Sequence, residues 1–242
     1  MNGTLGRPPE GTDYVVWSGG LDSTLILARL ASEPKPNRAV HAIVVDRHPQ
    51  LDGTMMAAQR TARAAFLKLA KKRGWAFKVT RLSIGVSGPA RIMADNPQAS
   101  LWLHLASLYV VTGDTLHFGY IRGDDFWHTG GEFKAAFQAM CAYKRAEATL
   151  SYPLEWSQKV DVVSGLRSLK VPPRCVWTCE EPLPGRGGKL GACGQCSKCK
   201  DLASAIAVLP ARGPLPGKLY VQRRSLSGSL KAPRPMPVTF RW

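Results

Sequence analysis

The chain has 242 residues, 45% of them hydrophobic, so one α/β domain with a small appendage can bury a sizeable core. No apolar run is long enough to span a bilayer, and the first ten residues lack the apolar core of a secretion signal, so we expect a cytoplasmic protein. The formal net charge of +16 favours an anionic partner such as a nucleotide, a nucleic acid or an acidic protein surface.

The first predicted strand, Tyr14–Trp17, runs into a Ser-Gly-Gly turn and a predicted helix over Leu21–Leu30. Paired glycines let the backbone approach a charged ligand, and the start of a helix adds unpaired N–H donors and a partial positive charge. Serine and threonine hydroxyls add further donors. This arrangement can form a phosphate site, although a glycine pair after a strand is also an ordinary way to turn into a helix. We call its residues the SGG loop: Ser18, Gly19, Gly20, Leu21, Asp22, Ser23 and Thr24.

The second predicted strand covers Arg38–Asp46. Residues at the ends of strands in open α/β sheets face the ligand crevice. Asp46, Arg47 and His48 are therefore candidate substrate-binding residues, although an ordinary solvated strand exit is equally compatible with the pattern.

Helices and strands are then predicted to alternate: a helix over Thr54–Arg73 capped by Gly74, a half-exposed strand over Ala76–Ile84, a long loop over Gly85–Gln98, an apolar helix over Ala99–Val111 and a buried strand over Thr115–Ile121. The basic outer face of the first of these helices is expected to be solvated. The alternation predicts a parallel sheet with helices on both faces.

A strand-end loop from Arg122 carries two further candidates, Asp125 and Phe126, and a predicted helix follows over Glu132–Ala148. A short extended stretch, Ser151–Trp156, precedes a predicted helix over Ser157–Leu169. Lys159 lies in the first turn of that helix, where a cation opposes the macrodipole. It therefore points into solvent or has an anionic partner, and the sequence alone favours solvent.

Four of the six cysteines lie close together: Cys179, Cys193, Cys196 and Cys199. Three thiols in a C-x2-C-x2-C pattern with a fourth upstream supply a tetrahedral set of soft ligands, which predicts a zinc site in a reducing compartment. An iron–sulphur cluster uses the same ligands and remains an alternative. Cys141 and Cys175 are expected to be packing residues. A short helix over Ser197–Leu209 leaves the site.

The last segment, residues 210–242, contains seven basic residues and no acidic one. Such a tail suits contact with phosphates or docking on a partner, and a mobile surface extension fits equally well.

The SGG loop and the cysteine pattern together give the chain a family resemblance. The string S-G-G-L-D-S-T resembles the pyrophosphate loop of the N-type ATP pyrophosphatases. With Thr178-Cys179 and the later C-G-Q-C-x-x-C, the chain resembles the 7-cyano-7-deazaguanine synthases of the queuosine pathway (QueC-like proteins). Gly119–Phe126, Glu132-Phe133 and the stretch from Pro153 to Lys159 look like further family positions, and the resemblance covers roughly residues 13–209.

The resemblance implies a homodimeric enzyme with one zinc on the four cysteines. It implies that ATP, with Mg²⁺, adenylates the carboxylate of 7-carboxy-7-deazaguanine, and that ammonia then gives the amide and a second activation the nitrile. Asp22, Ser23 and Lys159 become the expected catalytic residues, with the ATP phosphates as the anionic partner of Lys159. The implied division is an ATP pyrophosphatase domain over 1–170, a metal-binding segment over 171–209 and a basic tail over 210–242.

The chain departs from the family pattern on the acceptor side. Family members carry G-Q-R-H where this chain has Val45-Asp46-Arg47-His48, and G-R-N where it has residues 96–100 without an arginine. Some diverged members belong to antiphage defence operons. Two alternatives to the nitrile therefore stay open: a ligase that couples the activated deazapurine to a protein or another macromolecular amine, and an RNA-modifying adenylase.

Overall fold

The computed structural model describes residues 11–47, 49–84, 98–184 and 190–209. Five parallel strands form one sheet in the order β3-β2-β1-β4-β5, with β1 (Gly11–Val16) in the centre. The other four strands are β2 (Arg38–Arg47), β3 (Lys78–Ile84), β4 (Thr115–His117) and β5 (Thr149–Ser151). The predicted parallel α/β fold is confirmed.

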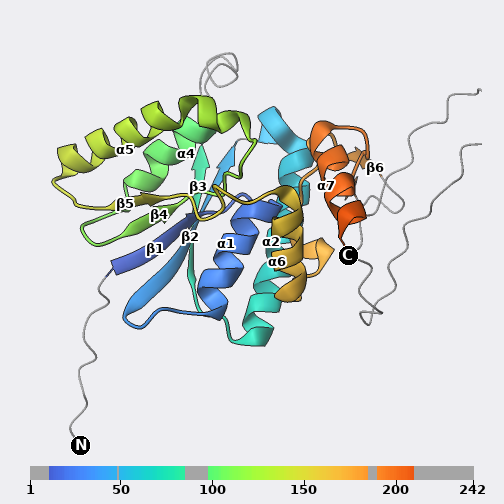
Figure 1. Cartoon of the computed structure of the whole chain (residues 1–242), viewed down its shortest axis with the longest axis horizontal. Coiled ribbons are helices and arrows are strands. Elements are labelled where there is room, and N and C mark those ends of the chain that lie inside the picture. The colour runs from blue at the N-terminus through green and yellow to red at the C-terminus, as the bar shows by residue number, and fades with distance from the viewer. Residues whose placement is uncertain (1–10, 48, 85–97, 185–189, 210–242) are drawn as a thin grey trace, which may run out of the picture.

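Helices cover both faces of the sheet (Figure 1). One face packs against α1 (Leu21–Ser32), α2 (Pro49–Arg73) and α6 (Lys159–Ser168), and the other against α4 (Gln98–Ser107) and α5 (Gly130–Lys144). The strands supply both faces because successive side chains alternate. Val15 joins the core under α1, whereas Val16 joins the core under α4 and α5.

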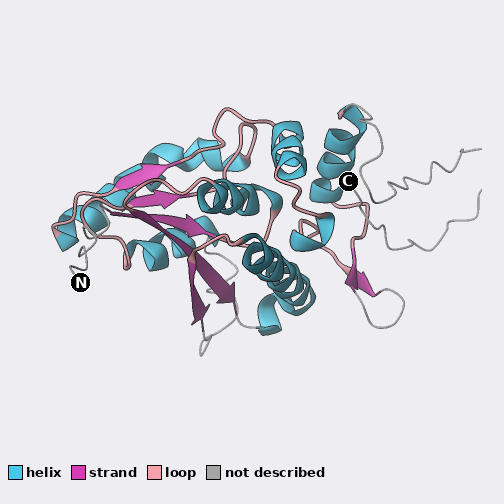
Figure 2. Ribbon diagram, turned by 90° about the horizontal axis from the view of Figure 1, so that it is seen from below, coloured by secondary structure: helices cyan, strands magenta, loops and turns pink. Residues whose placement is uncertain are grey.

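The cysteine segment forms a small unit beside the main sheet. A short 3₁₀ turn, η2 (Pro173–Cys175), precedes a two-stranded antiparallel hairpin of β6 (Leu183–Pro184) and β7 (Leu190–Gly191), and α7 (Ser197–Val208) follows. Figure 2 shows this hairpin apart from the five-stranded sheet. Cys141 and Cys175, expected to be packing residues, are buried in the two cores.

Several predicted boundaries were wrong. The fourth strand ends at His117 rather than Ile121, and residues 153–156 form a turn instead of continuing β5. The predicted helix over 99–111 ends at Ser107, where the Lys144 ammonium donates to the carbonyls of Ser107, Leu108 and Val110 at 2.6–3.0 Å.

The helix over 132–148 ends at Lys144 because Arg145 adopts a left-handed conformation with φ 54°. The expected long loop and the basic tail lie outside the described residues, except that Gln98 begins α4. Within the described parts of the chain, no helix has the length and apolarity that crossing a membrane requires.

Candidate functional site

The strand order reverses direction between β1 and β4, since the sheet grows to one side through β2 and β3 and to the other through β4 and β5. Open α/β sheets bind ligands beyond the carboxyl ends of the strands at such a point. The SGG loop follows β1, and residues 118–120 follow β4. A Cβ added at Gly119 would lie 2.8 Å from the backbone nitrogen of Ser23, so glycine is what allows the two segments to meet.

The SGG loop turns sharply from β1 into α1. Gly19 has φ +91°, a conformation that favours glycine, and Gly20 is extended before the first helical residue. Among the described residues no side chain caps the start of α1, which leaves backbone N–H groups for a ligand. The Ser18 hydroxyl accepts a hydrogen bond from the Gly20 N–H at 3.1 Å and lies 3.1 Å from the Ser23 hydroxyl. The geometry fits an anion at this end of the helix.

Two members of the SGG loop have buried side chains. Thr24 is fully buried, and its hydroxyl accepts a hydrogen bond from the indole N–H of Trp17 at 3.0 Å. The Thr24 hydroxyl thus has a partner inside the fold, and its contact with phosphate stays a prediction. Leu21 is buried in the core beneath α1, so only its backbone is available to a ligand.

Lys159 contacts the SGG loop rather than pointing into solvent. Its ammonium donates to both carboxylate oxygens of Asp22 at 2.9 Å, and the two side chains are 18% and 22% exposed. The close approach of α6 to α1 makes the pair possible: a Cβ on Gly165 would lie 3.0 Å from Leu25 Cδ1. Burial raises the pKa of Asp22, and the Lys159 ammonium opposes that shift. The expectation of a solvated Lys159, drawn from helix position alone, was wrong.

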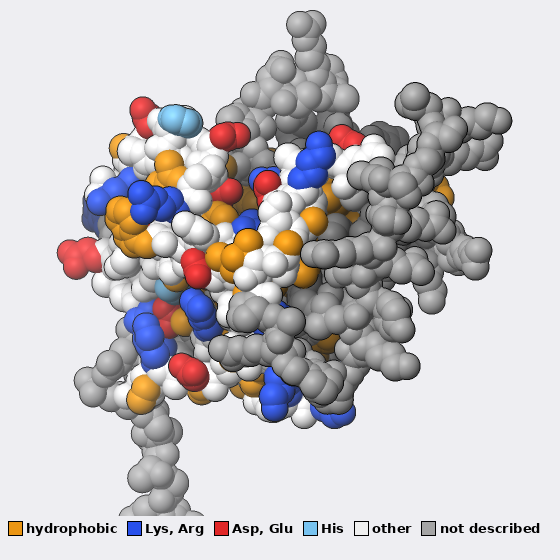
Figure 3. Space-filling model, turned by 45° about the vertical axis from the view of Figure 1, so that its right-hand side comes forward, with side chains coloured by type: hydrophobic (Ala, Val, Ile, Leu, Met, Phe, Trp, Pro, Cys, Tyr) orange, Lys and Arg blue, Asp and Glu red, His pale blue; other side chains and the backbone are white. Residues whose placement is uncertain are grey.

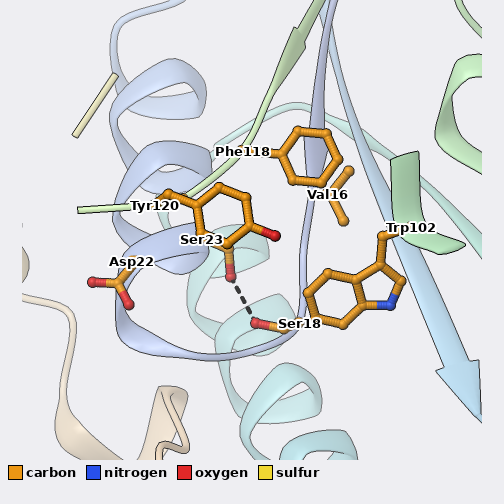
Figure 4. A pocket seen from close by; sticks show the side chains of 8 residues that line it. Val16, Ser18, Asp22, Ser23, Trp102, Phe118 and Tyr120 are labelled. Atoms are coloured by element: carbon orange, nitrogen blue, oxygen red, sulfur yellow. Dashed lines mark hydrogen bonds between the residues drawn. The ribbon is translucent and has the colours of Figure 1, made fainter. Parts of the chain in front are cut away.

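A small hollow of about 60 Å³ opens between the SGG loop and the end of β4. Aromatic rings of Trp102, Phe118 and Tyr120 line this hollow beside the paired hydroxyls of Ser18 and Ser23 (Figure 4). Asp22 lies on the far side of Ser23 from Trp102 in the same view. The sequence analysis missed Phe118 and Tyr120 because it extended the fourth strand through Ile121, although a glycine at position 119 permits a close approach. Trp102 comes from α4, so its place here depends on how that helix packs.

Asp46 is held by two arginines. Its carboxylate accepts from Arg63 Nη2 at 2.6 Å and lies 3.4 Å from Arg60 Nε. Arg63, expected on a solvated basic face, is 3% exposed and also donates to the backbone carbonyl of Ser18 at 2.6 Å. A substrate role for Asp46 therefore stays a prediction. His48 and the side chain of Arg47 lie outside the described parts of the structure.

Asp125 and Phe126 lie in a 3₁₀ turn, η1 (Asp125–Thr129). Phe126 stacks on Tyr120 with ring centroids 3.7 Å apart, so it supports the ring that lines the hollow. Asp125 is exposed, and its neighbour Asp124 accepts a hydrogen bond from the Ile121 N–H at 2.9 Å. Substrate contact by Asp125 and Phe126 remains a prediction.

The four cysteines of the C-terminal segment converge. Their sulphur atoms all lie within 4.8 Å of one another. Four ligands at ~2.3 Å in a tetrahedron lie about 3.8 Å apart, so the described cysteines fit a single metal ion. Backbone N–H groups of Cys193 and Cys196 donate to Cys179 Sγ at 3.2 Å and Cys193 Sγ at 3.3 Å. We call these four residues the cysteine cluster.

The thiols of the cluster differ in acidity. Burial raises the pKa of Cys199 and Cys179. Burial also opposes ionisation of Cys193, but N–H donors from Cys196 and Gln195 outweigh it and lower the pKa of Cys193 to about 7. The cluster therefore contains one readily ionised thiol, which suits the thiolate ligation that soft metals require.

Comparison with known proteins finds a likeness in structure but none in sequence. No known family profile and no curated protein matches the sequence. Among solved structures, the chain is similar to the U34-tRNA thiolase NcsA from Methanococcus maripaludis with its [4Fe-4S] cluster, with a TM-score of 0.45 and 14% identity over 70% of this chain. The match spans 60% of the thiolase, less than two thirds of its length. A likeness this low assigns no function.

Proposed function

We propose that the protein is an ATP-dependent enzyme that adenylates a carboxylate and releases pyrophosphate. One observation carries the proposal: the Lys159 ammonium, the hydroxyls of Ser18 and Ser23 and the open start of α1 all converge at the switch point of the sheet. Cations and fixed N–H dipoles at one anion site are what phosphoryl and nucleotidyl transfer require.

In the proposed reaction a carboxylate oxygen attacks the α-phosphorus of ATP. The new P–O bond forms as the bond between the α-phosphorus and the bridging oxygen breaks, and that oxygen leaves with pyrophosphate. Lys159 and the backbone N–H groups of the SGG loop stabilise the charge that builds on the leaving group. Asp22 holds Lys159 in place and offers a carboxylate of the type that binds Mg²⁺.

The carboxylate we propose is that of 7-carboxy-7-deazaguanine, following the sequence resemblance. The rings of Trp102, Phe118 and Tyr120 line the hollow beside the SGG loop, and they offer faces on which a planar base could stack. Ammonia would displace AMP from the acyl adenylate to give the amide. A second ATP would adenylate the amide oxygen, which would then leave with AMP as the nitrile forms.

The cysteine cluster is proposed to hold one structural zinc ion. Four buried sulphur atoms within 4.8 Å of one another support a single ion rather than a larger iron–sulphur cluster, which separates its thiolates further. When bound, the ion would fix the chain around the cluster. The Trp177 N–H, two residues before Cys179, donates to the Gly19 carbonyl at 2.9 Å, so the cluster adjoins the phosphate loop.

A second candidate is transfer of the adenylated deazapurine to a macromolecular amine. The net charge of +16 and the acid-free segment over 210–242 favour it. On the face drawn in Figure 3, basic and acidic side chains of the described residues are intermixed, so this face offers no single basic patch. We assign affinity for an anionic macromolecule to the acid-free segment over 210–242, and it should weaken with salt.

The test is product analysis. Purified protein receives ATP, Mg²⁺ and 7-carboxy-7-deazaguanine with ammonia or with candidate protein and nucleic-acid amines, and mass spectrometry follows AMP, pyrophosphate, amide and nitrile. We expect AMP formation that depends on the deazapurine and is lost in Asp22→Asn. Protein truncated after Leu209 should keep adenylation, and only macromolecular transfer should suffer. Absence of AMP with every acceptor would exclude the proposed reaction.

A further inference from the structure

A buried arginine lies behind the SGG loop. Arg63 projects from α2 and is 3% exposed. Its two terminal nitrogens serve different acceptors: Nη1 donates to the Ser18 carbonyl and Nη2 to the Asp46 carboxylate, each at 2.6 Å. The planar guanidinium suits this arrangement because its donors are fixed in a fork. Burial lowers the pKa of Arg63, and the Asp46 carboxylate opposes that shift.

Successive carbonyls of the loop are thus held from outside it. Arg63 holds the Ser18 carbonyl, and the Trp177 N–H holds the Gly19 carbonyl at 2.9 Å. A trans peptide is planar, so its N–H points opposite to its C=O. Turning the Ser18 carbonyl toward Arg63 therefore turns the Gly19 N–H away from α2. Gly19 packs tightly here, since a Cβ would lie 2.9 Å from Arg63 Cγ.

We propose that Arg63 is a positioning residue for phosphate binding, with Asp46 as its anchor. It holds the Ser18–Gly19 peptide with the N–H directed toward the phosphate groups, and its charge polarises that peptide, which strengthens the N–H as a donor. The inference rests on the proposed ATP site and assigns Asp46 to the support of the loop. A lysine at position 63 supplies the charge without the fork and replaces it only in part.

The test uses a charge-neutral double variant, Arg63→Met with Asp46→Leu. Removing both partners leaves no unpaired buried charge, so the fold is retained, and the net charge of the site is unchanged. The matched control is Arg73→Met. Arg73 lies on the same helix and donates to the carbonyls of Leu169 and Lys170, at the other end of α2 from the loop.

Two readouts are taken on the full-length protein. Isothermal titration calorimetry measures affinity for inorganic pyrophosphate and for ATP, each with Mg²⁺. Hydrogen–deuterium exchange of residues 18–24 reports on the loop without ligand. We expect the double variant to lose about tenfold in both affinities, the size expected for one weakened hydrogen bond to a charged group, and its loop to exchange faster. Arg63→Lys should fall between wild type and the double variant.

The outcomes separate the inference from the proposed function. If the wild type binds pyrophosphate and the double variant binds and exchanges like Arg73→Met, Arg63 has no positioning role and the ATP site stands. If the wild type binds neither ATP nor pyrophosphate, both the site and the role of Arg63 are overturned. Weakened binding in the double variant, with wild-type affinity in Arg73→Met, supports the assignment.

Discussion

The SGG loop and the cysteine cluster adjoin each other, yet the protein holds them in different ways. Side chains and backbone N–H groups brace the loop from outside, through Arg63 and Trp177. The cluster instead gathers four buried sulphur atoms within 4.8 Å of one another, with the Sγ atoms of Cys193 and Cys199 3.9 Å apart. Under the proposed function, the loop is preorganised for phosphate, whereas the cluster would depend on a bound ion to hold its thiolates together.

Because of this difference, we expect the largest loss of stability from a substitution in the cysteine cluster. Cys199→Ser should remove the metal and cost several kcal/mol of stability, because structural metal binding is coupled to folding. Elemental analysis should find one zinc per chain in the wild type and none in the variant, with lower folding yield. Cys141→Ser, a buried cysteine outside the cluster, should keep its zinc. Iron and visible absorbance in the wild type would instead indicate an iron–sulphur centre.

The next largest effect is expected from a substitution that lowers the stability of the fold without changing the candidate site. Asp13 lies on β1 away from the SGG loop, and its carboxylate contacts His117 Nε2 and Arg38 Nε, both at 2.9 Å. Asp13→Asn should cost about 3 kcal/mol at neutral pH, because it breaks a buried ion pair. Affinity for ATP should not change.

The pH dependence of that variant follows from the carboxylate. Burial opposes ionisation of Asp13, but His117 and Arg38 outweigh it and lower its pKa below the ordinary 3.8. The ion pair therefore stabilises the fold fully above pH 3.8, and its contribution is lost as the pH falls from there through the lower pKa of Asp13 in the folded protein. Urea unfolding should show the gap between wild type and Asp13→Asn closing at acid pH. A gap that stays constant would mean that the pair does not carry the effect.

Lys159→Ala tests the loop itself. Removing this cation should slow ATP-to-AMP turnover by about a hundredfold, which is ~2.7 kcal/mol of transition-state stabilisation. The melting temperature should change little, since the pair with Asp22 is partly exposed. Lys200→Ala, an exposed lysine on α7, is the control and should retain full rate. Full activity in Lys159→Ala would remove it from the site.

The smallest effect is expected from a substitution in the glycine turn of the SGG loop. Gly19→Ala introduces a Cβ at φ +91° and 2.9 Å from Arg63 Cγ, so we expect a cost of about 1–2 kcal/mol and weaker ATP binding. Gly53→Ala is the matched control, because a Cβ there has no neighbour within 4 Å and lies in a helix. It should leave stability equal or raise it by about 0.5–1 kcal/mol. Equal behaviour of the two variants would contradict a tightly packed loop.

The sequence by itself determined the features that depend on neighbouring residues. Strand, glycine pair and helix start are contiguous, so the SGG loop and its place at the carboxyl end of β1 could be predicted from local backbone chemistry. The spacing of Cys193, Cys196 and Cys199 likewise predicted convergent thiols, because a C-x2-C turn brings sulphur atoms together. Alternation of strands and helices predicted the parallel sheet.

Only the tertiary structure decided which distant groups meet at the loop. Lys159 is 137 residues from Asp22, and their contact depends on the close approach of α6 to α1 at Gly165. Arg63 was expected in solvent, but it is buried behind the SGG loop, where it contacts Asp46 and the Ser18 carbonyl. Helix periodicity and charge describe a single element, whereas these contacts depend on how elements cross, which is set by packing across the sheet.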